Sequence, residues 1–117
     1  MAKGEKVGER MSIFVVETCL VKPEKRVEFK LLMQRVRKYK EENPELFREV
    51  KSWKLYRQMF GGIAGVYVSM WEFENLADLE KCWAKEEKDE SFRKMHQELL
   101  KLIDPATFSM KIWASAM

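Results

Sequence analysis

The sequence is poor in the residues that usually mark a metal site, a redox site or a targeting signal. Cysteine occurs twice, at Cys19 and Cys82, and neither lies in a CxxC pair, which excludes the common zinc and thioredoxin signatures. Histidine occurs once, at His96, and a single histidine cannot build an ordinary metal site. We therefore expect two reduced thiols and no bound metal.

Long apolar runs and a surplus of one charge are also missing. No apolar run approaches the length of a membrane span, and residues 1–10, MAKGEKVGER, lack the apolar core of a signal peptide. Lys and Arg number 22 against 19 Asp and Glu, and the basic residues alternate with acids instead of forming a basic face. These absences predict a cytoplasmic protein that binds neither nucleic acid nor a membrane.

Two common catalytic arrangements are missing too. The sequence has no G-x-S-x-G elbow for a serine nucleophile, and its acids cluster in runs typical of a solvated surface. Gly61 and Gly62 are adjacent, but no helix opens directly after them. They therefore indicate a hairpin turn with positive φ angles, and not a phosphate-binding loop.

What is present is the pattern of one globular domain. The chain has 117 residues, of which 46% are hydrophobic and 35% are charged, enough for a single core under a charged surface. We expect residues 1–10 to be a flexible lead-in and residues 11–117 to form one α+β domain.

Alternation over residues 65–74 predicts a central strand of that domain, followed by a helix capped by Asn75. Similar patterns predict strands over 12–21, 50–60 and 107–117. The expected helices span residues 23–42, the stretch from Asn75 to a polar break at 85–90, and residues 91–103 with Ser91 as the cap. The first helix should bury an apolar stripe with Phe29 and Met33 at its flanks, formed by Val27, Leu31, Leu32, Val36 and Tyr39.

Glu17 is the one charge in the apolar first strand. An unpaired carboxylate is costly to bury, so Glu17 should meet a cation, a hydrogen-bond donor or water. We interpret it as a charge at a strand edge or a dimer rim in preference to a catalytic acid.

The element order is β-α-β-β-α-β, with the second helical unit broken in two. This order predicts a ferredoxin-like α+β fold, a four-stranded antiparallel sheet with helices on one face. Large apolar side chains nevertheless occur on both faces of the strands. The face without helices must be covered, and a second copy packed sheet against sheet, in a homodimer, is the simplest cover.

Residues 11–117 resemble the dimeric α+β barrel superfamily, which includes NIPSNAP-like proteins, antibiotic-biosynthesis-type monooxygenases and bacterial haem-degrading monooxygenases. The resemblance depends on the strand ending WEFEN, the helix LADLEKCW and an F-x-x-x-H motif that ends at His96. It implies ferredoxin-like subunits whose sheets pair. In the haem-degrading branch, Trp71 and His96 look like the pocket tryptophan and the haem ligand, whereas Thr18 stands where that branch has asparagine. We expect no cofactor, with haem as the alternative.

We expect a ligand pocket between the sheet and the helices. Its predicted lining is aromatic, sulfur-containing or polar: Thr18, Trp53, Tyr67, Trp71, Met95, His96 and Trp113. Packing in the core or in a dimer interface explains the same aromatic residues more simply, and a hydrogen-bonded core or rim histidine explains His96.

Three functions are consistent with this pattern. The first is a homodimeric protein that binds a small apolar or aromatic molecule between sheet and helices. The second is a monooxygenase, cofactor-independent or haem-dependent, with Trp71 shaping the pocket and His96 acting as ligand or base. The third is a structural or assembly role without catalysis.

Overall fold

The computed structural model describes residues 12–116. The flexible lead-in predicted for residues 1–10, the domain start at residue 11 and the final residue of the predicted fourth strand lie outside the described residues. No helix within residues 12–116 is both long enough and apolar enough to cross a membrane.

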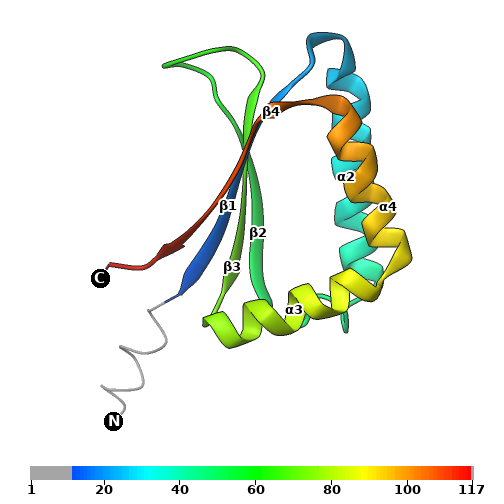
Figure 1. The fold of residues 1–117 in the computed structure, drawn as a ribbon, viewed down its shortest axis with the longest axis vertical. Coiled ribbons are helices and arrows are strands. Elements are labelled where there is room, and N and C mark those ends of the chain that lie inside the picture. The colour runs from blue at the N-terminus through cyan, green and yellow to red at the C-terminus, as the bar shows by residue number, and fades with distance from the viewer. Residues whose placement is uncertain (1–11, 117) are drawn as a thin grey trace.

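The elements follow the predicted order, with the second helical unit divided in two. They are β1 (Ile13–Val21), η1 (Pro23–Lys25), α2 (Arg26–Glu42), β2 (Val50–Arg57), β3 (Val66–Phe73), α3 (Leu76–Lys88), α4 (Glu90–Leu102) and β4 (Ile103–Ala114). The strands pair antiparallel in the order β2-β3-β1-β4, and the helices cover one face of the sheet (Figure 1). This is the predicted ferredoxin-like α+β fold.

The side chains of the two interior strands, β1 and β3, alternate between a helix-covered face and an open face of the sheet. Val15 pairs with Trp71 on the helix-covered face, and Thr18 pairs with Val68 on the open face. Within the described chain, the helices lie on the first face alone (Figure 1). The predicted alternation is therefore confirmed, and a single described chain leaves one apolar face without a cover.

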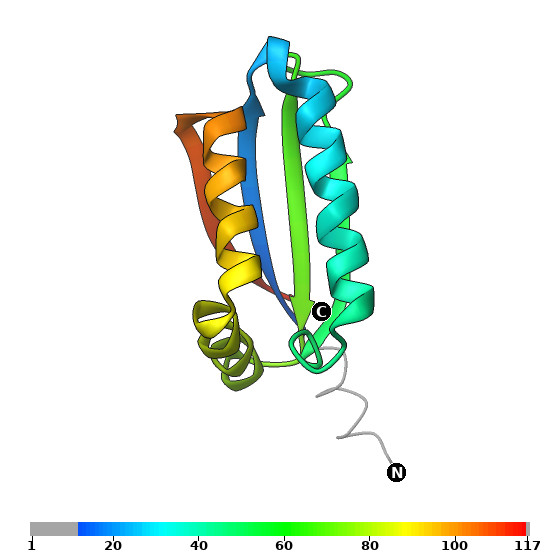
Figure 2. The ribbon, with the colours of Figure 1, turned by 90° about the vertical axis from the view of Figure 1, so that its right-hand side faces the viewer.

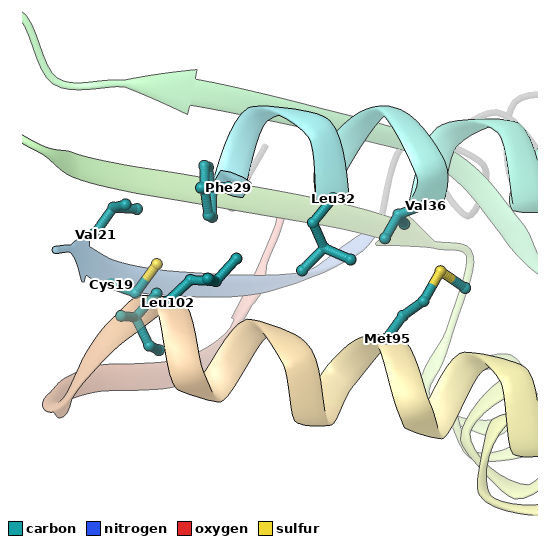
Figure 3. Packing of buried hydrophobic residues seen from close by; sticks show 8 residues of the cluster. Cys19, Val21, Phe29, Leu32, Val36, Met95 and Leu102 are labelled. Carbon is teal, nitrogen blue, oxygen red and sulfur yellow. The ribbon is translucent and has the colours of Figure 1, made fainter. Parts of the chain in front are cut away.

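The main core lies between β1 and the helices α2 and α4. Figure 3 shows side chains of α2 and α4 meeting above β1, among them Phe29, Leu32 and Met95. The predicted stripe of α2 was partly wrong, because Val27 is 73% exposed and Leu31 is 54% exposed. Phe29 occupies the buried side instead, since its ring packs 4.6 Å from the ring of Tyr67.

The predicted break within residues 85–90 is confirmed, but it is shorter than expected. Helix α3 continues to Lys88, and a single residue, Asp89, separates it from α4. The Asp89 carboxylate accepts the backbone N–H of Phe92 at 2.8 Å, so Asp89 caps α4 in place of Ser91. The cap predicted at Asn75 is confirmed, because its side chain accepts the N–H of Asp78 at 2.8 Å.

Two strand boundaries also differ from expectation. Strand β2 ends at Arg57, and the loop that follows takes its positive φ angles at Gly61 and Gly65, not at Gly62. Strand β4 begins at Ile103, which was expected in the helix. Because β4 is an edge strand, it tolerates a proline near its start.

Candidate functional site

A cavity of about 600 Å³ lies between the sheet and the helices. All four strands and the helices α2, α3 and α4 contribute to its lining. Figure 2 looks onto the helices that form its roof, with the sheet behind them as its floor. Residues from both ends of the chain therefore meet at one site.

Aromatic rings form a fixed wall of this cavity. Trp53 stacks on Trp71, with ring centroids 4.9 Å apart, and Trp71 is supported by the buried Phe47, which is stacked at 6.2 Å and does not itself line the cavity. The Trp53 indole donates to the Ser69 hydroxyl at 2.7 Å, which fixes the orientation of the ring. The sequence places these groups together because Trp53 and Trp71 are direct cross-strand partners in β2 and β3.

Glu17 lies in the floor of the cavity and not at a strand edge. Strand β1 is an interior strand, so the interpretation of Glu17 as an edge charge is wrong. The Trp71 indole donates to Glu17 Oε1 at 3.2 Å, which confirms that a donor meets the buried carboxylate. Burial nevertheless raises the pKa of Glu17, because the single neutral donor offsets the desolvation only in part.

Glu86 is the second acid of the cavity. The Cys82 thiol donates to Glu86 Oε2 at 3.4 Å. Burial raises the pKa of Glu86 to about 7, helped by the negative charges of Glu17 and Asp89 and opposed by the Cys82 hydrogen bond and the charge of Lys85. The site therefore contains a carboxyl group that changes its charge near neutral pH.

The mouth of the cavity carries exposed polar side chains. His96 and Arg93 of α4 line it together with Glu87 of α3, and all three are exposed. On the solvent side, Arg35 of α2 and Glu98 of α4 form a two-pronged ion pair, with both N–O distances at 2.9 Å. This ion pair links α2 to α4.

The structure brings together five of the seven predicted pocket residues. Those that line the cavity are Trp53, Tyr67, Trp71, Met95 and His96. Thr18 and Trp113 lie on the open face, where Thr18 pairs with Val68 and Trp113 pairs with Phe14. Their placement in the pocket is corrected because side chains alternate strictly along a strand.

Sequence reasoning missed Glu86 because it lies in a run of charges. The signal was its spacing, since Glu86 follows the buried residues Leu79 and Cys82 at seven and four positions, which places all three on one helix face. No group of three or more metal-ligating side chains occurs within residues 12–116.

Comparison with protein-family models gives no match, and neither does a search of curated proteins. Solved structures give clear matches. One is a NIPSNAP family protein of unknown function from Agrobacterium tumefaciens, with a TM-score of 0.68, 16% identity, and coverage of 92% of this chain and 90% of that one. A second is a candidate antibiotic biosynthesis monooxygenase from Caulobacter crescentus, with a TM-score of 0.70, 16% identity, and coverage of 97% and 98%.

A third match is a dimeric protein of unknown function and ferredoxin-like fold from Bacteroides fragilis, with a TM-score of 0.60, 14% identity, and coverage of 89% and 96%. At these identities the likeness shows a shared fold. The chain therefore has the fold of the dimeric α+β barrel proteins, as its sequence resemblance indicated.

Proposed function

We propose that the protein binds a small apolar or aromatic molecule in the cavity between sheet and helices. The observation that carries this proposal is a cavity of about 600 Å³, walled by the fixed stack of Trp53 and Trp71. Its size lies in the range of small-molecule sites, roughly 300–1,000 Å³, which combine an apolar lining with a few polar groups. Glu17, Ser69 and Glu86 are such polar groups here.

Binding is tested with N-phenyl-1-naphthylamine, a neutral apolar dye that fluoresces when it leaves water. We expect saturable binding that Met33→Trp weakens about tenfold, because Met33 lines the cavity and a larger side chain fills it. Leu31→Trp is the matched control on the same helix, since Leu31 is 54% exposed. Equal binding by both variants would contradict the proposed site.

We also propose that the open face of the sheet pairs with a second copy of the chain. The centre of this face is apolar and is formed by Phe14, Val16, Leu20, Val66, Val68 and Met70. Lys54 and Lys111 lie beside this centre on the two edge strands. An apolar centre with a polar rim is the usual anatomy of a protein interface.

The β2–β3 loop adds apolar surface on the same side. The loop extends beyond the end of the sheet toward the open face (Figure 1). Its residues Met59, Phe60 and Ile63 are 72%, 88% and 69% exposed. Apolar side chains this exposed favour a partner that covers them, and the Bacteroides protein of the same fold is described as dimeric.

The lining of this cavity argues against haem as its ligand. His96, the one histidine of the chain, is exposed at the mouth. The interior instead presents Glu17 and Glu86, whereas haem itself carries two carboxylates. We therefore infer a function without haem, and the test is a haemin titration in which the His96→Ala variant and the parent protein give the same unshifted absorbance spectrum.

Cofactor-independent oxidation of a quinol-type molecule is a second candidate function. It is favoured by the position of Glu17, because a carboxylate whose pKa is raised by burial accepts protons more readily than an exposed one. The fold likeness to a candidate antibiotic biosynthesis monooxygenase points the same way. Oxygen uptake with a quinol should then be lost in Glu17→Gln, and equal uptake by both proteins would contradict it.

The two cysteines support a cytoplasmic location. Both are free and buried. Burial raises the pKa of Cys19 to about 11 and raises that of Cys82 as well, so both remain protonated and unreactive at neutral pH. Buried reduced thiols are typical of a reducing compartment.

A further inference from the structure

The charges around the cavity are not distributed evenly. Five acidic or basic side chains of the described residues line it: Glu17, Glu86, Glu87, Arg93 and His96. The two half-buried members, Glu17 and Glu86, are both acids, whereas the other three are exposed at the mouth. The interior is therefore acidic, and the nearby basic groups lie in water.

The lysine next to Glu86 in the sequence forms its ion pair with another acid. Lys85 adjoins Glu86 in the sequence, but its ammonium lies 2.7 Å from Glu49 Oε1 and 2.6 Å from the backbone oxygen of Glu45. The Arg93 guanidinium donates to the backbone oxygen of Glu87 at 3.4 Å. Within the described residues, neither cation forms an ion pair with Glu17 or Glu86, and the charge of Lys85 offsets the burial of Glu86 only in part, which leaves a charge for a ligand to compensate.

The two acids also have few hydrogen-bond partners. Within the described residues, Glu17 receives the Trp71 indole and Glu86 receives the weakly polar thiol of Cys82. A carboxylate can accept about four hydrogen bonds, so both retain acceptor capacity toward the cavity. An ammonium group supplies three donors and a positive charge.

The remaining walls suit the body of such a ligand. Trp53, Tyr67, Trp71 and Phe92 line the same cavity, and the first and third are locked by hydrogen bonds through their indole groups. Aromatic faces attract cations as well as apolar groups. The combination of acids and aromatic rings therefore favours a cationic ligand over a neutral or anionic one.

We propose that the cavity takes an organic amine, a protonated amino group on an apolar or aromatic body, with the ammonium between Glu17 and Glu86. This inference rests on the proposed function of the cavity as a ligand site. A bound ammonium favours the charged form of Glu86, which lowers the pKa of that carboxyl from about 7. Binding therefore releases a proton near neutral pH, and affinity rises between pH 6 and pH 8.

The proposal is tested by calorimetry with three probes of one shape: 2-(2-naphthyl)ethylamine, 2-(2-naphthyl)ethanol and 3-(2-naphthyl)propionate. At pH 8 the amine should bind about tenfold more tightly than the alcohol, and the carboxylate should bind most weakly. Alcohol affinity equal to or above that of the amine would overturn the amine proposal while leaving the ligand site intact. Absence of binding by all three probes would overturn both.

Matched variants test whether Glu17 and Glu86 bind the ammonium group of the ligand. Glu17→Gln and Glu86→Gln should each weaken amine binding about tenfold and weaken alcohol binding much less, so the preference for the amine falls while the retained alcohol binding reports an intact cavity. Glu87→Gln is the control, because Glu87 is exposed at the mouth. An equal loss in all three variants, or no loss in the first two, would contradict the assignment.

Discussion

At the scale of single residues, Glu17 and Glu86 differ from the other acids because both are half-buried in the lining of the cavity. Each owes its raised pKa first to burial. The sequence marked Glu17 as unusual, since it interrupts an apolar strand, but it could not show whether that strand was interior or at an edge. That distinction depends on the strand order, which is set by long-range pairing.

Replacing Glu86 should change how stability depends on pH. The pKa of Glu86 is about 7 in the folded state and 4.5 in the unfolded state. The protonated carboxyl therefore contributes to the free energy of unfolding fully below pH 4.5, and this contribution is lost as pH rises through 7. Glu86→Gln carries no charge, so its free energy of unfolding relative to the parent should rise by about 2 kcal/mol from pH 5 to pH 8. Urea unfolding at fixed protein concentration measures this difference, and a difference independent of pH would contradict it.

The loop glycines allow a test of backbone strain. Gly65 has φ of +95°, is buried and accepts the N–H of Val21 through its carbonyl. Gly65→Ala should therefore cost about 1–2 kcal/mol of unfolding free energy. Gly62→Ala is the control, because Gly62 has no positive φ and a Cβ there would displace only the Gln58 side chain. Equal losses in the two variants would refute the conformational explanation.

At the scale of elements, Asp89 lies between α3 and α4 and connects both to α2. Its carboxylate caps α4 and also accepts the Tyr39 hydroxyl of α2 at 2.7 Å. Asp89→Ala removes both bonds and should lower the unfolding free energy by about 2 kcal/mol. Ser91→Ala, at the cap expected from sequence, should stay within about 0.5 kcal/mol. Thermal or urea unfolding of the two variants decides between the two caps.

Element types were predictable from sequence, and element ends were less so. The four strands were identified because each is a short run rich in β-branched and aromatic residues that alternate between two faces. The polar run at 85–90 was misread because a solvent-exposed helical turn and a loop have the same composition. The start of β4 was missed because Ile103 fits the helical spacing of α4, and only its pairing with Val21 shows that it is a strand residue.

At the scale of the whole molecule, two apolar features remain after the core is packed: the cavity under the helices and the open sheet face. The sequence predicted both in outline because its strands are apolar on two sides. The sequence could not assign every predicted pocket residue to the correct feature. Thr18 and Trp113 belong to the open face, and the other five predicted pocket residues line the cavity.

A charge in the middle of the open face should prevent self-association. Val68 lies on an interior strand between Thr18 and Tyr56, so Val68→Glu would place a carboxylate in the proposed interface. We expect this variant to be a folded monomer or an unstable chain, and circular dichroism distinguishes the two. Val27→Glu changes a residue that is 73% exposed on α2 and should leave the assembly unchanged. A Val68→Glu variant that still dimerises would contradict the proposed interface.

Sedimentation equilibrium of the unmodified protein tests the central claim, that a second copy covers the open sheet, most directly. The account predicts a single species of twice the chain mass of 14.0 kDa, stable at micromolar concentration. A monomer of 14.0 kDa at the same concentration, with the sheet face left in water, would contradict it.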